Sequence, residues 1–264
     1  MKRAALFFDI DGTLLSEVTH QIPESAVHAL EEAKKKGHLI FVNTGRTICS
    51  IPEELKRLPV HGFLCGCGIY GEFEEEIFFE KHLDGKAADA IVKKAQECRV
   101  DALYEGKDDV YFSSRISRFD SLENTRKYMN NRGLGLERCI EQGGCAYDKL
   151  FAYEDEHSNS REFFDFLSDY LEILDRGNHT YECIMKGYSK ATIMEVVLKK
   201  FGIGREDSYA FGDSSNDLAM FRYAGHGIAM GVHDPALDPY AEYIAPAVEE
   251  EAIWQSMKHY GLIL

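Results

Sequence analysis

The sequence of 264 residues has no long hydrophobic run, and its longest unbroken apolar stretch covers only residues 4–8. A membrane-spanning helix needs roughly 20 such residues, so we expect no transmembrane segment. Basic residues are also scarce: 30 Lys and Arg stand against 45 Asp and Glu, which gives a net charge of −15. Nucleic acids and anionic membranes attract cationic surfaces. We therefore expect neither as a partner.

The sequence also lacks the cysteine and glycine patterns of several protein classes. Its seven cysteines are odd in number and show no disulfide-framework or zinc-site spacing. No signal-peptide pattern is found, so we expect reduced thiols and a cytoplasmic protein. The pattern Gly66-x-Gly68-x-x-Gly71 binds dinucleotides only where a helix follows directly. Residues 72–79 have a strand pattern instead, which argues against a nucleotide site.

Short apolar runs alternate with helical patterns at both ends of the chain. The first helix is expected between Pro23 and Gly37, and another ends at Gly202. Further helices are expected at 51–58, 217–223 and 250–260, and strands at 4–8, 39–42, 62–65, 208–211 and 226–230. Strands that alternate with helices predict an α/β fold with a doubly wound, Rossmann-like parallel sheet.

The middle of the chain has a different pattern. A strand is expected at residues 73–79 and a helix at 84–98, followed by a mixture of strands, helices and glycine-rich turns. This pattern predicts an inserted α+β domain of about 100 residues, an ordinary domain size. We therefore expect a core domain from residues 1–82 and 185–264, and an inserted domain from residues 83–184.

An acidic motif, Asp9-Ile10-Asp11-Gly12-Thr13, follows the first predicted strand directly. Two ionised carboxylates about 4 Å apart would repel each other by about 4 kcal/mol at an effective dielectric constant of about 20. Such a pair needs a bound cation, a shared proton or full contact with water. A solvated turn capped by Asp and Gly is the alternative interpretation.

Three further motifs follow predicted strands or begin predicted helices. Asn43-Thr44-Gly45-Arg46 offers a hydroxyl, a flexible glycine and free N–H groups, which suit a phosphate-sized anion. Lys190 begins a helix, and Gly212-Asp213-Ser214-Ser215-Asn216-Asp217 follows a strand. Each motif alone also fits an ordinary helix cap or a solvated lysine.

The predicted positions of these motifs bring them together. Asp9, Thr44 and Asp213 stand at the carboxyl ends of predicted parallel strands, where open α/β sheets bind ligands. Ligand sets made only of oxygen suit Mg²⁺ rather than Zn²⁺. A carboxylate nucleophile beside Mg²⁺ and a lysine is suited to phosphoryl transfer through an aspartyl-phosphate.

In order and spacing, these motifs resemble the four motifs of the haloacid-dehalogenase-type phosphatases. The resemblance is carried by residues 9–14, 44–46, Lys190 and 212–217. The insert between the second and third motifs is similar in position and size to the cap of the Cof-type members. The resemblance implies a Mg²⁺-dependent hydrolase of small phosphorylated metabolites, such as sugar phosphates, with the insert as a substrate-selecting cap. No protein partner is evident.

The resemblance also implies a role for each motif residue. Asp9 would attack phosphorus and bind Mg²⁺, while Asp11 would act as general acid and then base, with its backbone carbonyl on the metal. Asp213 would be the remaining metal ligand. The phosphoryl oxygens would be held by Thr44, Lys190, Asn216 and the main-chain N–H groups of Ile10 and Gly45. The supporting residues would be Gly12, Thr13, Arg46 and Asp217, the last of which would orient Lys190.

Two residues depart from the family's pattern. Cys67, in the segment 63–68, stands where these proteins usually carry Asn, on the substrate side of the site. Ala191 follows the lysine where Gly is usual. Neither position is assigned to the chemistry.

The motifs leave two other functions open. A phosphomutase of similar cap type, such as phosphomannomutase, is less similar at Thr44-Gly45-Arg46 and would need a bisphosphate activator. A phosphorylatable switch or phosphate sensor would keep a long-lived acyl phosphate. Such a protein would have no evident use for Asp11, because the expected role of Asp11 is to activate water. Release of inorganic phosphate from simple esters separates a hydrolase from a switch.

Overall fold

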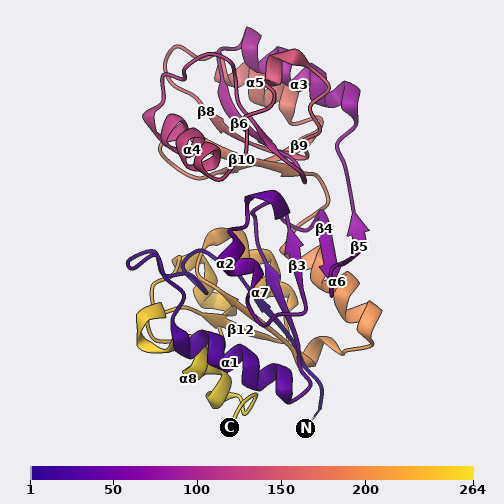
Figure 1. Cartoon of the computed structure of the whole chain (residues 1–264), viewed down its shortest axis with the longest axis vertical. Coiled ribbons are helices and arrows are strands. Elements are labelled where there is room, and N and C mark those ends of the chain that lie inside the picture. The colour runs from indigo at the N-terminus through magenta and orange to yellow at the C-terminus, as the bar shows by residue number, and fades with distance from the viewer. Residues whose placement is uncertain (1) are drawn as a thin grey trace. The chain divides into compact units, whose positions relative to one another are not determined.

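A computed structural model describes residues 2–264, and the chain divides into two compact units. The first unit comprises the chain up to Gly45, Pro52–Glu80 and Tyr188–Leu264. The second comprises Arg46–Ile51 and Lys81–Gly187. Each unit has its own β-sheet (Figure 1).

The first unit is built on an eight-stranded sheet with the order β13-β12-β11-β1-β2-β3-β4-β5. Its strands are β1 (Ala5–Phe8), β2 (Leu39–Asn43), β3 (Gly62–Cys65), β4 (Tyr70–Phe73), β5 (Glu76–Glu80), β11 (Ser208–Gly212), β12 (His226–Ala229) and β13 (Tyr243–Ile244). Neighbours from β13 to β3 are parallel, and β4 and β5 are antiparallel. The α/β fold with a mainly parallel sheet is thus confirmed. The central strands β1 and β2 are fully buried, as expected for a sheet covered on both faces.

Helices of the first unit cover this sheet. They are α1 (Glu24–Lys35), α2 (Glu53–Lys56), α6 (Lys190–Phe201), α7 (Leu218–Tyr223) and α8 (Ala252–His259), with short 3₁₀ segments at Arg205–Asp207, Ser215–Asp217, Pro235–Tyr240 and Val248–Glu250. Helices α6 and α7 pack on the sheet face that carries Phe7 and Phe41. Helices α1 and α8 lie side by side (Figure 1), and the ring of His28 stacks on that of Trp254 at 4.9 Å.

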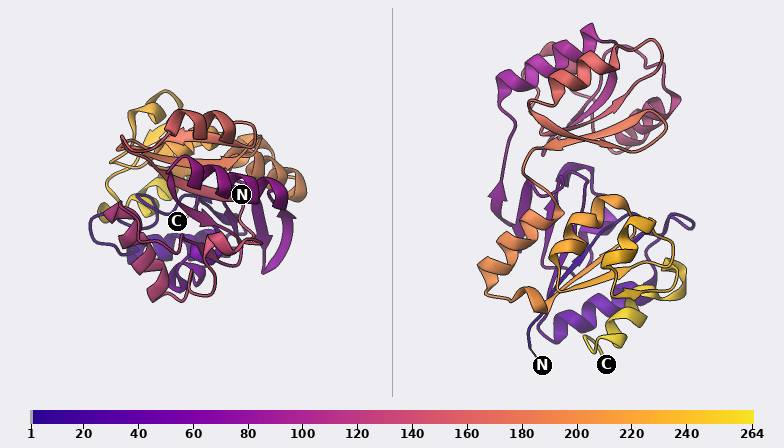
Figure 2. Two further views of the ribbon diagram at one scale, coloured as in Figure 1. Left: turned by 90° about the horizontal axis from the view of Figure 1, so that it is seen from above. Right: turned by 180° about the vertical axis from the view of Figure 1, so that it is seen from behind.

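The second unit has a five-stranded antiparallel sheet in the order β7-β6-β8-β10-β9. Its elements are α3 (Gly85–Glu97), β6 (Asp101–Glu105), β7 (Val110–Tyr111), α4 (Asp120–Asn131), β8 (Lys149–Tyr153), α5 (Ser160–Leu167), β9 (Leu171–Asp175) and β10 (Thr180–Met185), with 3₁₀ segments at Ile48–Ser50 and Ile140–Gln142. Helices α3 and α5 lie side by side on one face of the sheet, and α4 packs on the other (Figure 2). The unit therefore has a three-layer α+β architecture with two separate cores.

The strand expected at residues 73–79 is in fact a hairpin. Strand β4 ends at Phe73 and β5 begins at Glu76. Glu74 and Glu75 turn the chain between them, with φ of 49° and 68°. The acidic sequence hid the turn because it has no Gly, Asn or Asp, the residues that usually mark a left-handed turn.

The helix expected at residues 51–58 is only one turn long, α2. Pro52 precedes it and holds Ile51 in an extended conformation with φ −73° and ψ 124°. A residue before proline is disfavoured in the helical region because it would clash with the proline ring. The chain therefore forms a 3₁₀ turn at Ile48–Ser50, breaks at Ile51 and starts again at Glu53.

Candidate active site

Asp9 is the first residue beyond the buried strand β1, and only 4% of its surface is exposed. Its N–H donates to the carbonyl oxygen of Phe211 at 3.0 Å, which continues the β1–β11 pairing to the end of the strand. The chain then turns sharply, because the N–H groups of residues 13–15 all donate to the carbonyl oxygen of Ile10. The turn keeps the Asp9 carboxylate at the carboxyl edge of the sheet.

Lys190 begins helix α6, and its side chain is completely buried. The hydroxyl of Ser189 caps the helix by accepting the N–H of Thr192. The Nζ atom lies 2.8 Å from Oδ1 of Asp9 and 2.6 Å from Oδ1 of Asp217. Burial alone would lower the pKa of Lys190, but the charges of these two carboxylates raise it above its usual range. Lys190 is therefore a permanently charged group at the centre of the site.

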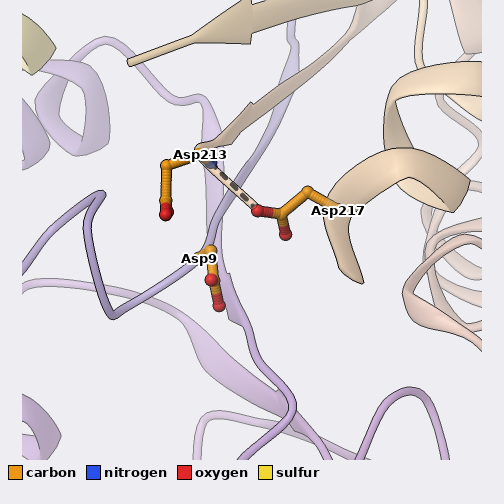
Figure 3. Close-up of side chains that lie close together, drawn as sticks. All are labelled: Asp9, Asp213 and Asp217. Atoms are coloured by element: carbon orange, nitrogen blue, oxygen red, sulfur yellow. Dashed lines mark hydrogen bonds between the residues drawn. The ribbon is translucent and has the colours of Figure 1, made fainter. Parts of the chain in front are cut away.

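Asp213 and Asp217 come from the turn after strand β11. Oδ2 of Asp217 accepts the N–H group of Asp213 at 3.0 Å (Figure 3) and that of Ser214 at 3.1 Å, which closes the turn. Oδ1 of Asp213 accepts the hydroxyl of Thr13 at 2.8 Å. This last bond joins the turn after β11 to the turn after β1.

Asp9, Asp213 and Asp217 form one acidic cluster, with carboxylate oxygens that lie within 4.8 Å of one another (Figure 3). Burial raises the pKa of Asp9 to about 7, with a contribution from Asp217 that Lys190 opposes. Burial and the charges of Asp9 and Asp217 raise the pKa of Asp213 to about 8. Both carboxylates are thus destabilised in their charged form, which is the condition that a bound cation relieves.

The cluster has the chemistry of a divalent-cation site. Oxygen donors in a buried acidic cluster suit Mg²⁺. Asp217 already binds Lys190 and two backbone N–H groups, so Asp9 and Asp213 are the better candidates for ligands. Gly12 keeps this space open: its φ is +76°, and a Cβ there would lie 2.4 Å from Oδ2 of Asp213. A cavity of about 350 Å³ reaches Gly12 and Asp213.

The phosphate-binding candidates lie at the same edge of the sheet. Phe8 pairs with Val42, so the residues after β1 and β2 stand side by side. Thr44 is buried, and its N–H donates to Leu64 at 2.9 Å. Oδ1 of Asn216 accepts from Lys190 at 3.1 Å.

Three other predicted site residues, Asp11, Gly45 and Arg46, are not members of the acidic cluster described above. Asp11 follows in the same turn as Asp9, and its side chain is not part of the acidic cluster found among residues 2–264. Gly45 is half-buried at the end of the first segment of the first unit, whereas Arg46 belongs to the second unit.

Sequence reasoning placed Asn43, the last residue of β2, in the motif of residues 43–46 but gave it no role. It is completely buried, and its Nδ2 donates to the carbonyl oxygen of Lys190 at 3.0 Å. Besides its place in that motif, its sequence signal was a polar residue at the end of an otherwise apolar strand. Such a residue is expected to be hydrogen-bonded once it is buried.

Within residues 2–264, no helix has the length and apolar character that a membrane span requires.

The chain resembles known proteins over its whole length. The family pattern of haloacid dehalogenase-like hydrolases matches residues 6–257. The putative phosphatase YkrA of Bacillus subtilis (strain 168) is 27% identical over 270 residues, which cover 100% of both chains. The 5-amino-6-(5-phospho-D-ribitylamino)uracil phosphatase YitU of the same organism is 26% identical over 263 residues, covering 96% of this chain and 95% of that protein.

A solved structure agrees with these sequence relatives. The sugar phosphatase BT4131, of haloacid dehalogenase subclass IIB, superposes with a TM-score of 0.80 at 26% identity, covering 98% of this chain and 100% of that one. The family pattern, the full-length relatives and this structure point to the same family. The chain belongs to the haloacid dehalogenase-like hydrolases of the Cof type, and it is a phosphatase of that family.

Proposed function

We propose that the protein hydrolyses small phosphate monoesters with Mg²⁺, through an aspartyl-phosphate on Asp9. The observation that carries the proposal is the position of the Asp9 carboxylate. It is buried at the end of β1, 2.8 Å from a fully buried Lys190 and beside Asp213. A carboxylate in such a place is desolvated and oriented by a positive charge, as a nucleophile for phosphoryl transfer requires.

Asp9, Asp213 and the backbone carbonyl of Asp11 would hold the Mg²⁺ ion. The ion would supply positive charge to the phosphoryl oxygens and offset the repulsion between the phosphate and the carboxylates. The raised pKa values of Asp9 and Asp213 support this assignment, because each carboxylate lacks enough positive charge in the protein alone.

The reaction would proceed in two steps. In the first, a carboxylate oxygen of Asp9 forms a bond to phosphorus while the bond from phosphorus to the ester oxygen breaks. Asp11 donates a proton to the departing alkoxide, which leaves as an alcohol. In the second, Asp11 takes a proton from water as the water oxygen attacks phosphorus. Inorganic phosphate leaves, and the Asp9 carboxylate and the Asp11 proton are restored.

The phosphoryl oxygens would be bound by the surrounding residues. Lys190, the Thr44 hydroxyl and Asn216 supply side-chain groups, and Ile10 and Gly45 supply backbone N–H groups. These donors compensate the charge of the transferring phosphoryl group where it develops. Asp217 would act on Lys190, whose ammonium it holds at 2.6 Å. Thr13 would fix Asp213 through its 2.8 Å hydrogen bond.

The substrate would be a small phosphorylated metabolite, such as a sugar phosphate. YitU is named for a phosphate ester of a ribityl chain, and BT4131 is described as a sugar phosphatase. The inserted part of the second unit would act as the cap that selects among such esters. We place the cap at residues 83–184 and the catalytic core at 1–82 and 185–264, joined by short crossings.

A screen of a few dozen phosphorylated metabolites tests this proposal. We expect release of inorganic phosphate that requires Mg²⁺ and is abolished by Asp9→Asn. Phosphate moved within a substrate, with a requirement for a bisphosphate activator, would instead indicate a phosphomutase. A stable phosphoprotein without turnover would indicate a switch. Full activity in a metal chelator would contradict the metal assignment.

A further inference from the structure

The turn between β3 and β4 has an unusual backbone. Gly66, Cys67 and Gly68 have φ of 61°, 56° and 95°, so three consecutive residues are in the left-handed region. Cys67 has a side chain and is only 3% exposed. A left-handed conformation is unfavourable for such a residue and persists where the surroundings enforce it. The contacts of the turn show what those surroundings are.

The turn contacts two segments of the proposed active site, the one that follows β2 at Thr44 and the start of α6 at Ser189. The N–H of Cys67 donates to the carbonyl oxygen of Thr44 at 3.2 Å. The Cα of Gly68 packs against the backbone of Ser189, so closely that a Cβ would lie 2.1 Å from the Ser189 carbonyl oxygen. Ser189 caps α6, and Lys190 is the first residue of that helix. The turn therefore lies between the start of α6 and the loop that begins at Thr44 (the Thr44 loop), and its contacts limit the distance between them.

Asn43 also links the same two segments, through a hydrogen bond of its own. It directly precedes Thr44, and its Nδ2 donates to the carbonyl oxygen of Lys190 at 3.0 Å. The hydrogen bond from Asn43 holds the start of α6 close to β2, while the contact of Gly68 with Ser189 limits how closely α6 can approach. Together they define the position of the Lys190 backbone.

We propose that the 66–68 turn and Asn43 form a brace that sets the distance between Lys190 and the Thr44 loop, and thus the width of the phosphate site. The inference rests on the proposed function. Gly68 and Asn43 are positioning residues in this account, because they act through Lys190 and Thr44. The brace contributes to affinity for the phosphoryl group, because Lys190 and Thr44 must reach the phosphoryl oxygens at the same time.

The test compares Gly68→Ala with Gly37→Ala. Gly37 has a similar φ of +88°, but a Cβ there meets nothing within 4 Å. Both variants carry the strain of a left-handed alanine, and only Gly68→Ala also displaces Ser189. We expect Gly68→Ala to bind inorganic phosphate about tenfold more weakly in calorimetry with Mg²⁺, and to lose about 100-fold in kcat/KM. Gly37→Ala should stay within about twofold of the wild type in both.

Asn43→Leu provides a second test if Gly68→Ala does not fold. Leucine has the same branching and the same number of side-chain heavy atoms as asparagine. The Met220 sulfur, 3.8 Å from Nδ2, is an apolar neighbour for it, but leucine cannot donate to Lys190. We expect phosphate binding to weaken about fivefold or more, which is within the range for loss of one buried hydrogen bond. Binding within twofold of the wild type in the folded variants would overturn the brace. A wild type that binds phosphate but turns over no ester would instead count against the proposed function and leave the binding test of the brace intact.

Discussion

The ammonium of Lys190 lies 2.8 Å from Oδ1 of Asp9, and both side chains are buried. This contact joins the end of the first strand to the start of α6, two segments that the inserted unit separates in the sequence. It places a positive charge against the proposed nucleophile. The same ammonium also contacts Asp217 and Asn216, so one side chain organises most of the site.

Removal of this charge should damage stability and activity together. Lys190→Met leaves Asp9 and Asp217 buried without their counter-charge, a change that typically costs about 3–5 kcal/mol of unfolding free energy. It also removes a phosphate ligand, so we expect a loss of at least about 10² in kcat/KM on p-nitrophenyl phosphate. Chemical denaturation and steady-state kinetics measure the two effects.

Lys149 is the matched control for this substitution. It is 3% exposed in the second unit and lies 2.6 Å from Glu182 and 3.5 Å from Glu105. Lys149→Met should destabilise the protein by a similar amount, about 3–5 kcal/mol. Its folded fraction should keep activity on p-nitrophenyl phosphate within a few-fold of the wild type. Equal losses of activity in both variants would show that Lys190 acts only through stability.

The acidic cluster predicts a pH dependence of stability. The pKa of Asp9 is raised to about 7 and that of Asp213 to about 8, chiefly by burial. Between about pH 4 and pH 8 the metal-free folded protein holds protons that the unfolded chain has released. The free energy of unfolding contributed by these groups therefore falls as the pH rises.

Mg²⁺ should reverse this loss by displacing the protons. We expect the increase in melting temperature on addition of Mg²⁺ to be larger at about pH 8.5 than at about pH 5.5. Melting curves in chelator and in Mg²⁺ at the two pH values measure it. Asp213→Asn should reduce the difference between them. The same Mg²⁺-dependent increase at both pH values would contradict the assignment of Asp9 and Asp213 as ligands.

Gly12→Ala should disrupt the metal site specifically. Its Cβ would lie 2.4 Å from Oδ2 of Asp213 and would displace that carboxylate. Gly177→Ala is the control, because Gly177 has the same φ of +76° but a Cβ there has no neighbour within 4 Å. Both variants should lose about 1–2 kcal/mol to left-handed strain. Only Gly12→Ala should weaken Mg²⁺ binding in calorimetry, and equal Mg²⁺ affinities would refute this role of Gly12.

The parts of the fold that follow from sequence are those with local signals. Strand β1 is a continuous apolar run that stops at Asp9, and α6 has a serine cap and a glycine end at Gly202. Strands β6 and β9 were not predicted. Strand β6 has a charged residue at each end, and β9 is a half-exposed edge strand that contains Glu172 and ends at Asp175.

In the candidate site, too, local sequence signals could be predicted and long-range contacts could not. Asp9, Thr44, Lys190 and Asp213 could be proposed because motif spacing and strand ends are visible in the sequence. The contacts of Asn43 with Lys190, and of Gly68 with Ser189, could not, because they join residues far apart in the chain. No local pattern encodes such contacts.

The central claim is that Asp9 carries the phosphoryl group and Asp11 moves the protons. Asp9→Asn cannot attack phosphorus, so it should fail equally on every ester. Asp11→Asn keeps the nucleophile but loses the acid and the base. An alkyl phosphate needs the acid, and we expect a rate loss of about 10² to 10⁴ there. p-Nitrophenol leaves with little help, so its first step should survive.

The most direct measurement is a rapid-mixing experiment with Asp11→Asn, Mg²⁺ and p-nitrophenyl phosphate. We predict a burst of p-nitrophenol close to one equivalent per protein molecule, followed by slow turnover, with phosphate held on Asp9 in the accumulated intermediate. A steady rate without a burst, reduced as strongly as on an alkyl phosphate, would contradict the account.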